Sequence, residues 1–147
     1  MGRGNNQKYS RRELEQIIKD LGFRPDSNNG KVMGKGDHNV WVHEIYQDLK
    51  LVIPMAHREL CENEMSDICA NIIIAMKVLG MDISKFTHKE GIEGKLMKTA
   101  KNAEKNICIL FSPISKRSLG LNDEKDILNY IEETKKKIQK KINAFKK

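Results

Sequence analysis

The stretch that most constrains the fold is residues 34–43, where two glycines, an aspartate and a histidine lead into an alternating β-branched and aromatic run. A glycine-rich entry followed by such alternation is typical of a strand that begins at a tight bend. The sequence therefore predicts a strand over 38–44 whose first residue is His38. A histidine can exchange a proton near neutral pH, and Gly36 lets a large anionic substrate approach the backbone closely.

The residues around this strand predict a small α+β module over 10–86. A capping box that begins at Ser10 starts a helix, and Gly22 is placed to end it. A second helix is predicted to start near residue 63 and to end at Gly80. The predicted strands are 31–33, 38–44 and 49–53. This α-β-β-β-α order predicts a three-stranded antiparallel sheet with both helices on one face.

Strand alternation predicts the two faces of the central strand. Trp41 should face the helices as part of the core, whereas His38 should share the opposite face with Val40 and Val42. A sheet that is apolar on both sides requires a cover over its outer face. The candidates for this cover are the C-terminal helices, a second copy of the chain or a protein partner.

Residues 87–147 predict a basic helical hairpin that extends the module. One apolar stripe starts at Ile92 and a second at Ile127, both at helical spacing, with Asn122 as the expected cap of the second helix. Its acidic start and lysine-rich end would both complement the helix dipole. Residues 1–86 contain twelve basic and twelve acidic residues, so the net charge of +7 lies entirely in the extension.

The last fourteen residues, 134–147, contain seven lysines and no acidic residue. One interpretation is a basic helix that lies along phosphates, with strong salt dependence. The other is an amphipathic helix whose lysines simply face water. Lysine without arginine favours non-specific phosphate contacts over base reading.

Composition excludes several classes of protein. With 39% hydrophobic and 32% charged residues, the chain is typical of a soluble globular protein. The longest apolar run is too short to span a bilayer and the first residues lack the apolar core of a signal peptide, so we expect a cytoplasmic protein without membrane contacts. Three cysteines without a CxxC pair predict neither a disulfide framework nor a zinc site, and no cofactor is expected. His43 and His88 have no partner at metal-ligand spacing and are expected at the surface.

The order of these motifs resembles the HicA-type toxins, the mRNA interferases of HicA–HicB toxin–antitoxin pairs. The resemblance covers 10–86 and rests on Leu21-Gly22-Phe23, Gly36-Asp37-His38 with Trp41, Pro54 with His57, and Leu79-Gly80-Met81. It implies a double-stranded-RNA-binding-like fold, metal-independent cleavage of RNA, and a HicB-like antitoxin that covers the sheet face. The helical extension has no counterpart in the family pattern.

Cleavage of RNA without a metal requires a base for the 2′-hydroxyl and an acid for the leaving oxygen, and one histidine can serve at either step. The resemblance implies this catalytic role for His38, and the alternative is that His38 is an ordinary surface residue of the strand. Lys35, His57 and Arg58 would stabilise phosphate charge near the site, whereas the C-terminal lysines would contact phosphates from the basic helix. The candidate substrate-binding residues are Lys35, Gly36, His57, Arg58, Lys136, Lys137, Lys140 and Lys141.

Three functions remain open from the sequence. The first is a HicA-like endoribonuclease toxin that acts on RNA and is neutralised by a HicB-like antitoxin. The second is a non-catalytic module on the same fold, such as a phage-type inhibitor or regulator, that binds another protein or itself as a homodimer. The third is a nucleic-acid-binding protein that acts through its lysine-rich C-terminal helix.

Overall fold

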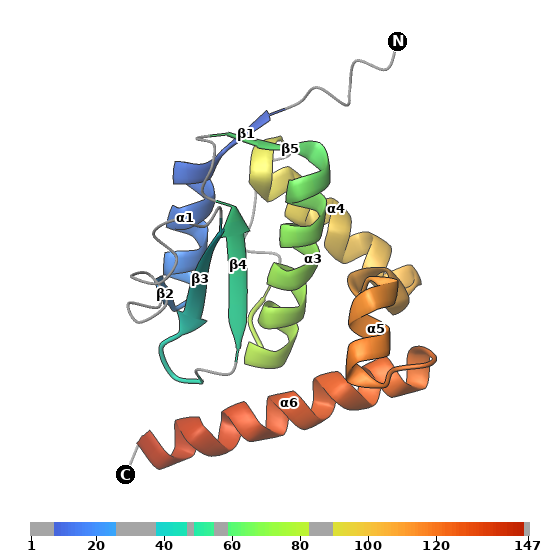
Figure 1. Ribbon diagram of the computed structural model, residues 1–147. Helices are drawn as coiled ribbons and strands as arrows, with labels where there is room; N and C mark the ends of the chain where they lie inside the picture. The colour runs from blue at the N-terminus through green and yellow to red at the C-terminus, as the bar shows by residue number, and fades with distance from the viewer. Residues whose placement is uncertain (1–7, 26–37, 47–48, 55–58, 83–89, 146–147) are drawn as a thin grey trace. The chain divides into compact units, whose positions relative to one another are not determined.

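The computed structural model describes residues 8–25, 38–46, 49–54, 59–82 and 90–145. Within these residues the chain is mixed α+β, with a three-stranded antiparallel sheet, a two-stranded sheet and a group of C-terminal helices (Figure 1). Two compact units, Met1–Ile68 and Cys69–Lys147, divide inside helix α3. The division into 10–86 and 87–147 that the sequence favours stays a prediction.

The three-stranded sheet belongs to the first unit and has the order β2-β3-β4. β2 is Phe23–Pro25, β3 is His38–His43 and β4 is Lys50–Pro54, with all neighbours antiparallel. The predicted hairpin of 38–44 and 49–53 is therefore confirmed. The sheet takes its remaining strand from β2, which the sequence did not predict, and the predicted strand 31–33 lies outside the described residues.

A second, two-stranded sheet pairs β1 (Lys8–Ser10) with β5 (Glu59–Cys61) in antiparallel register. Tyr9 lies opposite Leu60, and both side chains are buried. The Tyr9 hydroxyl also donates a hydrogen bond of 2.8 Å to Oε1 of Glu62. The sequence predicted neither strand, because strands of three residues show too little alternation to be recognised without their partner.

Helix α1 (Arg11–Asp20) forms where the capping box predicts it. The Ser10 side chain accepts a hydrogen bond of 3.3 Å from the backbone N–H of Glu13. The apolar stripe of α1 is buried through Leu14, Ile17 and Ile18, and the helix contacts β1 and β2. The cap and the stripe are both local features, which is why the sequence predicts this helix well.

The two faces of the sheet differ in burial as alternation predicts. Trp41, which is 2% exposed, is part of the core, as are Leu51 and Ile53 on β4. On the opposite face Val40 and Val42 are half-buried, and Val52, which lies opposite Val40, is 49% exposed. The prediction that Trp41 belongs to the core is confirmed.

Helix α3 (Glu62–Leu79) is the apolar helix that the sequence predicts. Its side chains are buried on more than one side, which matches its apolar circumference. The buried members are Met65, Ile68, Cys69, Ile72, Ile73, Ala75, Met76 and Val78. The helix ends at Gly80, whose φ of +71° allows the backbone N–H of Met81 to bond to the carbonyl of Met76.

The second unit contains α4 (Gly91–Lys105), the 3-10 helix η4 (Ile107–Leu110), α5 (Pro113–Leu119) and α6 (Glu124–Phe145). The first predicted apolar stripe is buried through Ile92, Leu96, Ala100, Ala103, Ile107 and Leu110. Both α4 and α6 contact η4. The helical hairpin prediction missed α5, because α5 buries no residue and has no apolar stripe to reveal it.

Two details at the ends of α6 differ from expectation. The cap is Asp123 rather than Asn122, because Oδ1 of Asp123 accepts a 2.9 Å hydrogen bond from the backbone N–H of Asp126. Oδ2 of Asp126 in turn accepts a 2.8 Å bond from the backbone N–H of Asn122. At the other end the last turn of α6 contains no basic residue, so the lysines lie upstream of the helix C-terminus. None of the helices in the described part of the chain combines the length and apolarity needed to cross a bilayer.

Candidate functional site

The first candidate site is the start of the central strand. His38 is the first residue of β3, and its backbone lies in register with Pro54, the last residue of β4. The antiparallel ladder therefore brings the start of β3 and the end of β4 to the same end of the sheet. The structure describes His38 through this backbone position alone.

Four of the residues predicted to surround His38 lie outside the described residues. They are Lys35, Gly36, His57 and Arg58. Chain connectivity places two of them, Lys35 and Gly36, a few residues before β3, and the other two between β4 and β5. Their roles stay predictions from the sequence.

His43, at the far end of β3 from His38, is a buried polar side chain rather than the surface histidine expected. It is 4% exposed, and its ring packs edge-on against Phe23 with centroids 5.2 Å apart. Its Nδ1 accepts a 3.2 Å hydrogen bond from the backbone N–H of Ile45. Nε2 must then carry the proton, and it donates to the carbonyl of Leu21 at 3.1 Å.

Burial favours the neutral form of His43. Burial lowers the pKa of His43 below its ordinary value of 6.5, as does the positive charge of Arg24, while the bond to Leu21 and the negative charge of Glu44 oppose this shift. A second proton would have to sit on Nδ1, where it would face the N–H of Ile45. We assign His43 a structural role, in which it connects the end of α1 to the end of β3. The alternation of the strand already indicated that His43 is buried, since residue 43 shares a face with the predicted core residue Trp41.

The second candidate site is a group of lysines in the second half of α6, here called the lysine cluster. It consists of Lys135, Lys136, Lys137, Lys140 and Lys141, all of which are exposed. Ile138, between them, is 1% exposed and belongs to the buried stripe that includes Ile127 and Ile131. The helical period therefore buries the isoleucines and leaves the lysines at the surface.

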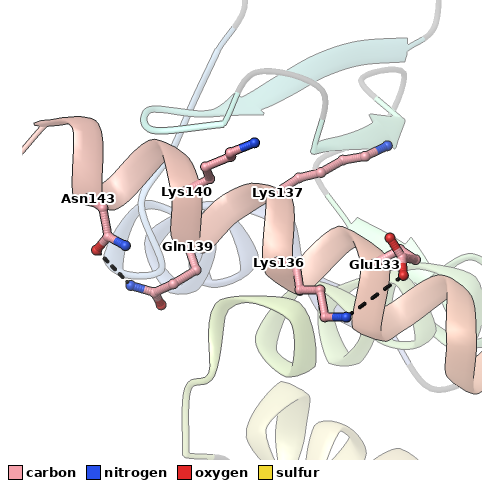
Figure 2. A pocket seen from close by; sticks show the side chains of 6 residues that line it. All are labelled: Glu133, Lys136, Lys137, Gln139, Lys140 and Asn143. Atoms are coloured by element: carbon pink, nitrogen blue, oxygen red, sulfur yellow. Dashed lines mark hydrogen bonds and ion pairs between the residues drawn. The ribbon is translucent and has the colours of Figure 1, made fainter.

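Three members of the cluster line an open hollow with a volume of ≈ 460 Å³ (Figure 2). Lys136, Lys137 and Lys140 contribute ammonium groups, and Lys137 and Lys140 extend to the same side of α6. Gln139 and Asn143 line it too, and the amide of Gln139 donates a 3.2 Å hydrogen bond to Oδ1 of Asn143. The predicted residue Lys141 is exposed but does not line this hollow.

Glu133 is the acidic member of the hollow. Its carboxylate pairs with Nζ of Lys136 at 4.0 Å, and both side chains are largely exposed. A pair at this distance in water is weak and screened by salt. Among the described residues, no ion pair involves Lys137 or Lys140, so the hollow has a net positive charge that can attract an anion.

The described residues contain no group of three or more histidine, cysteine, aspartate or glutamate side chains arranged to hold a metal ion. Comparison of the chain with protein-family models, with curated proteins and with solved structures found no match in any of the three.

Proposed function

We propose that this protein is a HicA-like endoribonuclease that cleaves RNA without a metal and uses His38 for proton transfer. The observation that carries the proposal is the position of His38 as the first residue of the central strand, in an antiparallel β2-β3-β4 sheet preceded by α1 and followed by α3. This is the order that the sequence resemblance implies. The HicB-like antitoxin that the resemblance also implies is part of the proposal.

The identity of β2 strengthens the resemblance. In the family pattern the leading helix ends in Leu-Gly-Phe, and here Leu21 caps α1 while Phe23 begins β2. The three motifs around Gly22, His38 and Pro54 thus fall at the end of α1, the start of β3 and the end of β4. Motifs at element ends are where a rigid sheet can present catalytic groups on its loops.

The test is RNA cleavage by wild type and His38→Ala. We expect the wild type to cleave in the presence of EDTA and His38→Ala to be at least about 100-fold slower, because loss of one acid–base group typically costs that much. Cleavage is measured on a labelled RNA by gel electrophoresis, with His88→Ala as the histidine control.

Three results are informative. Slow cleavage by His38→Ala with normal cleavage by His88→Ala supports the proposal. Cleavage that EDTA abolishes contradicts the metal-independent mechanism. No cleavage by either wild type or His38→Ala excludes the enzyme.

A second candidate function is self-association through the outer face of the sheet. It is favoured by Val52 on β4, a strand at the edge of the sheet. The side chain of Val52 is 49% exposed, and Val52 lies opposite Val40 on β3. An apolar surface beside a strand that, within the described residues, pairs on one side only is suited to another copy of the chain.

If this second function is correct, Val52→Lys converts a dimer into a monomer. The substitution removes an exposed apolar contact and places two like charges across the interface. Because Val52 is exposed, we expect the fold of the monomer to be unchanged. Light scattering after size-exclusion chromatography gives the mass, and Leu128→Lys, which changes a 47% exposed leucine of α6, is the matched control. A wild type that is monomeric at all concentrations contradicts this function.

A further inference from the structure

The dipole of α6 does not account for the lysine cluster. The helix dipole favours cations only within the last turn, and the last turn of α6 contains no basic residue. Lysines four residues apart repel each other on a helix surface, as in the pair Lys136 and Lys140 and the pair Lys137 and Lys141. A cluster that gains nothing from the dipole and carries internal repulsion is suited to an external anion.

We propose that the lysine cluster is a second RNA-binding surface, which holds the phosphate backbone of the RNA independently of its sequence. The inference rests on the proposed function for the choice of RNA as the polyanion. It differs from that function in its residues, because the cluster belongs to α6 and not to the end of the sheet where His38 lies.

The spacing of the cluster fits a phosphate backbone. A helix rises about 1.5 Å per residue, so residues 135–141 extend over about 9 Å of helix. Phosphates of one strand follow each other at about 3.4 Å along a duplex axis, so this length corresponds to about three of them. Lys136, Lys137 and Lys140, which line the hollow in Figure 2, would supply one ammonium group for each.

The chemistry of the surface favours phosphates over bases. Lysine binds phosphate as a point charge, whereas base edges in a groove are read most often by bidentate arginine. Residues 133–144 contain neither arginine nor any aromatic side chain on which a base could stack. Gln139 and Asn143 add amide donors beside the ammonium groups. The surface also lacks the exposed apolar residues that a helix needs to insert into a membrane.

The experiment measures equilibrium binding of a labelled RNA by fluorescence anisotropy, with His38→Ala as the parent protein so that no RNA is cleaved. The α6 variant is K136Q/K137Q/K140Q. We expect its plot of log affinity against log salt to lose a slope of about 2, since each phosphate contact on a single strand contributes about 0.7. Such a loss corresponds to about 100-fold weaker binding at 0.1 M salt and to no difference near 1 M.

The matched control is K98Q/K101Q/K105Q, which removes the same charge from exposed positions of α4. We expect it to bind RNA like its parent, because these lysines belong to α4 and not to the lysine cluster. Equal losses in the two variants would show a net-charge effect and overturn the proposal. K136R/K137R/K140R should retain binding, because it keeps the charges of the cluster and its fold.

Two further measurements separate the possible outcomes. The first is the binding of polyglutamate. If the parent binds polyglutamate as tightly as RNA and the α6 variant loses this binding, the surface is one for acidic proteins and the RNA proposal is overturned. In cleavage assays with active His38, the α6 variant should raise KM for long RNA and leave kcat unchanged. Loss of cleavage in His38→Ala tests the nuclease, and loss of the salt slope tests the lysine cluster, so either proposal can fail alone.

Discussion

Gly22→Ala is expected to lower the free energy of unfolding by about 3 kcal/mol. Gly22 has a φ of +103°, and a side chain in a left-handed conformation costs about 1–2 kcal/mol. A Cβ at this position would also lie 2.7 Å from Nε2 of His43, a buried ring that is fixed by hydrogen bonds on both nitrogens. Forcing extra atoms into such a packed site costs about 1–3 kcal/mol.

The two costs can be separated by a control and by a double variant. Gly120 has a φ of +72°, and a Cβ added there would meet no atom within 4 Å, so Gly120→Ala should cost the conformational part alone, about 1 kcal/mol. Removing the ring in His43→Ala should likewise make Gly22→Ala cheaper than it is in the wild type. Urea unfolding gives each value. Equal losses for Gly22→Ala and Gly120→Ala would contradict a close contact with His43.

His43→Ala is expected to lower the free energy of unfolding by about 3 kcal/mol at pH 8. The substitution leaves the carbonyl of Leu21 and the N–H of Ile45 without their partner, and each unsatisfied buried group costs about 1–3 kcal/mol. It also removes the edge-on contact with Phe23, which contributes about 0.5–1.5 kcal/mol. Thermal or urea unfolding of the two proteins at pH 8 measures the difference.

The same residue makes stability depend on pH. Because burial lowers the pKa of His43 in the folded protein, the unfolded chain, with its ordinary value near 6.5, binds the proton first as the pH falls. The contribution of neutral His43 is therefore complete above pH 6.5 and is lost as the pH falls towards the folded-state pKa.

Comparison of the two pH profiles isolates this effect, because all other titratable groups are common to both proteins. The wild type should lose stability below pH 6.5 faster than His43→Ala, so that the difference between them shrinks. A difference that stays constant from pH 8 to pH 5 would show that the proton on His43 does not affect folding.

The parts of the fold that the sequence predicts are those held by neighbouring residues. Ser10 caps α1 through a bond to Glu13, three residues away. The strands β3 and β4 are long enough to show alternation, and Trp41 is buried where that alternation places it. The apolar stripes of α3, α4 and α6 repeat over several turns, so they are evident without any partner.

Contacts between distant residues decided the rest. β1 and β5 are three residues each, and they become strands because Tyr9 lies opposite Leu60, far along the chain. β2 has only Phe23 buried, so it carries no recognisable pattern until β3 pairs with it.

The candidate sites also differ in how much of them the sequence predicts. The lysine cluster is evident in the sequence, because charge and helical period are properties of consecutive residues. Its position upstream of the last turn required the actual end of α6, and that position removes the dipole as an explanation. Alternation indicated that His43 is buried, but its partners Leu21, Phe23 and Ile45 are known only from the structure. Local patterns therefore determined the longer helices and strands. The very short strands and the partners of polar side chains depended on packing, because a hydrogen bond or a strand pair needs a second group that sequence proximity does not supply.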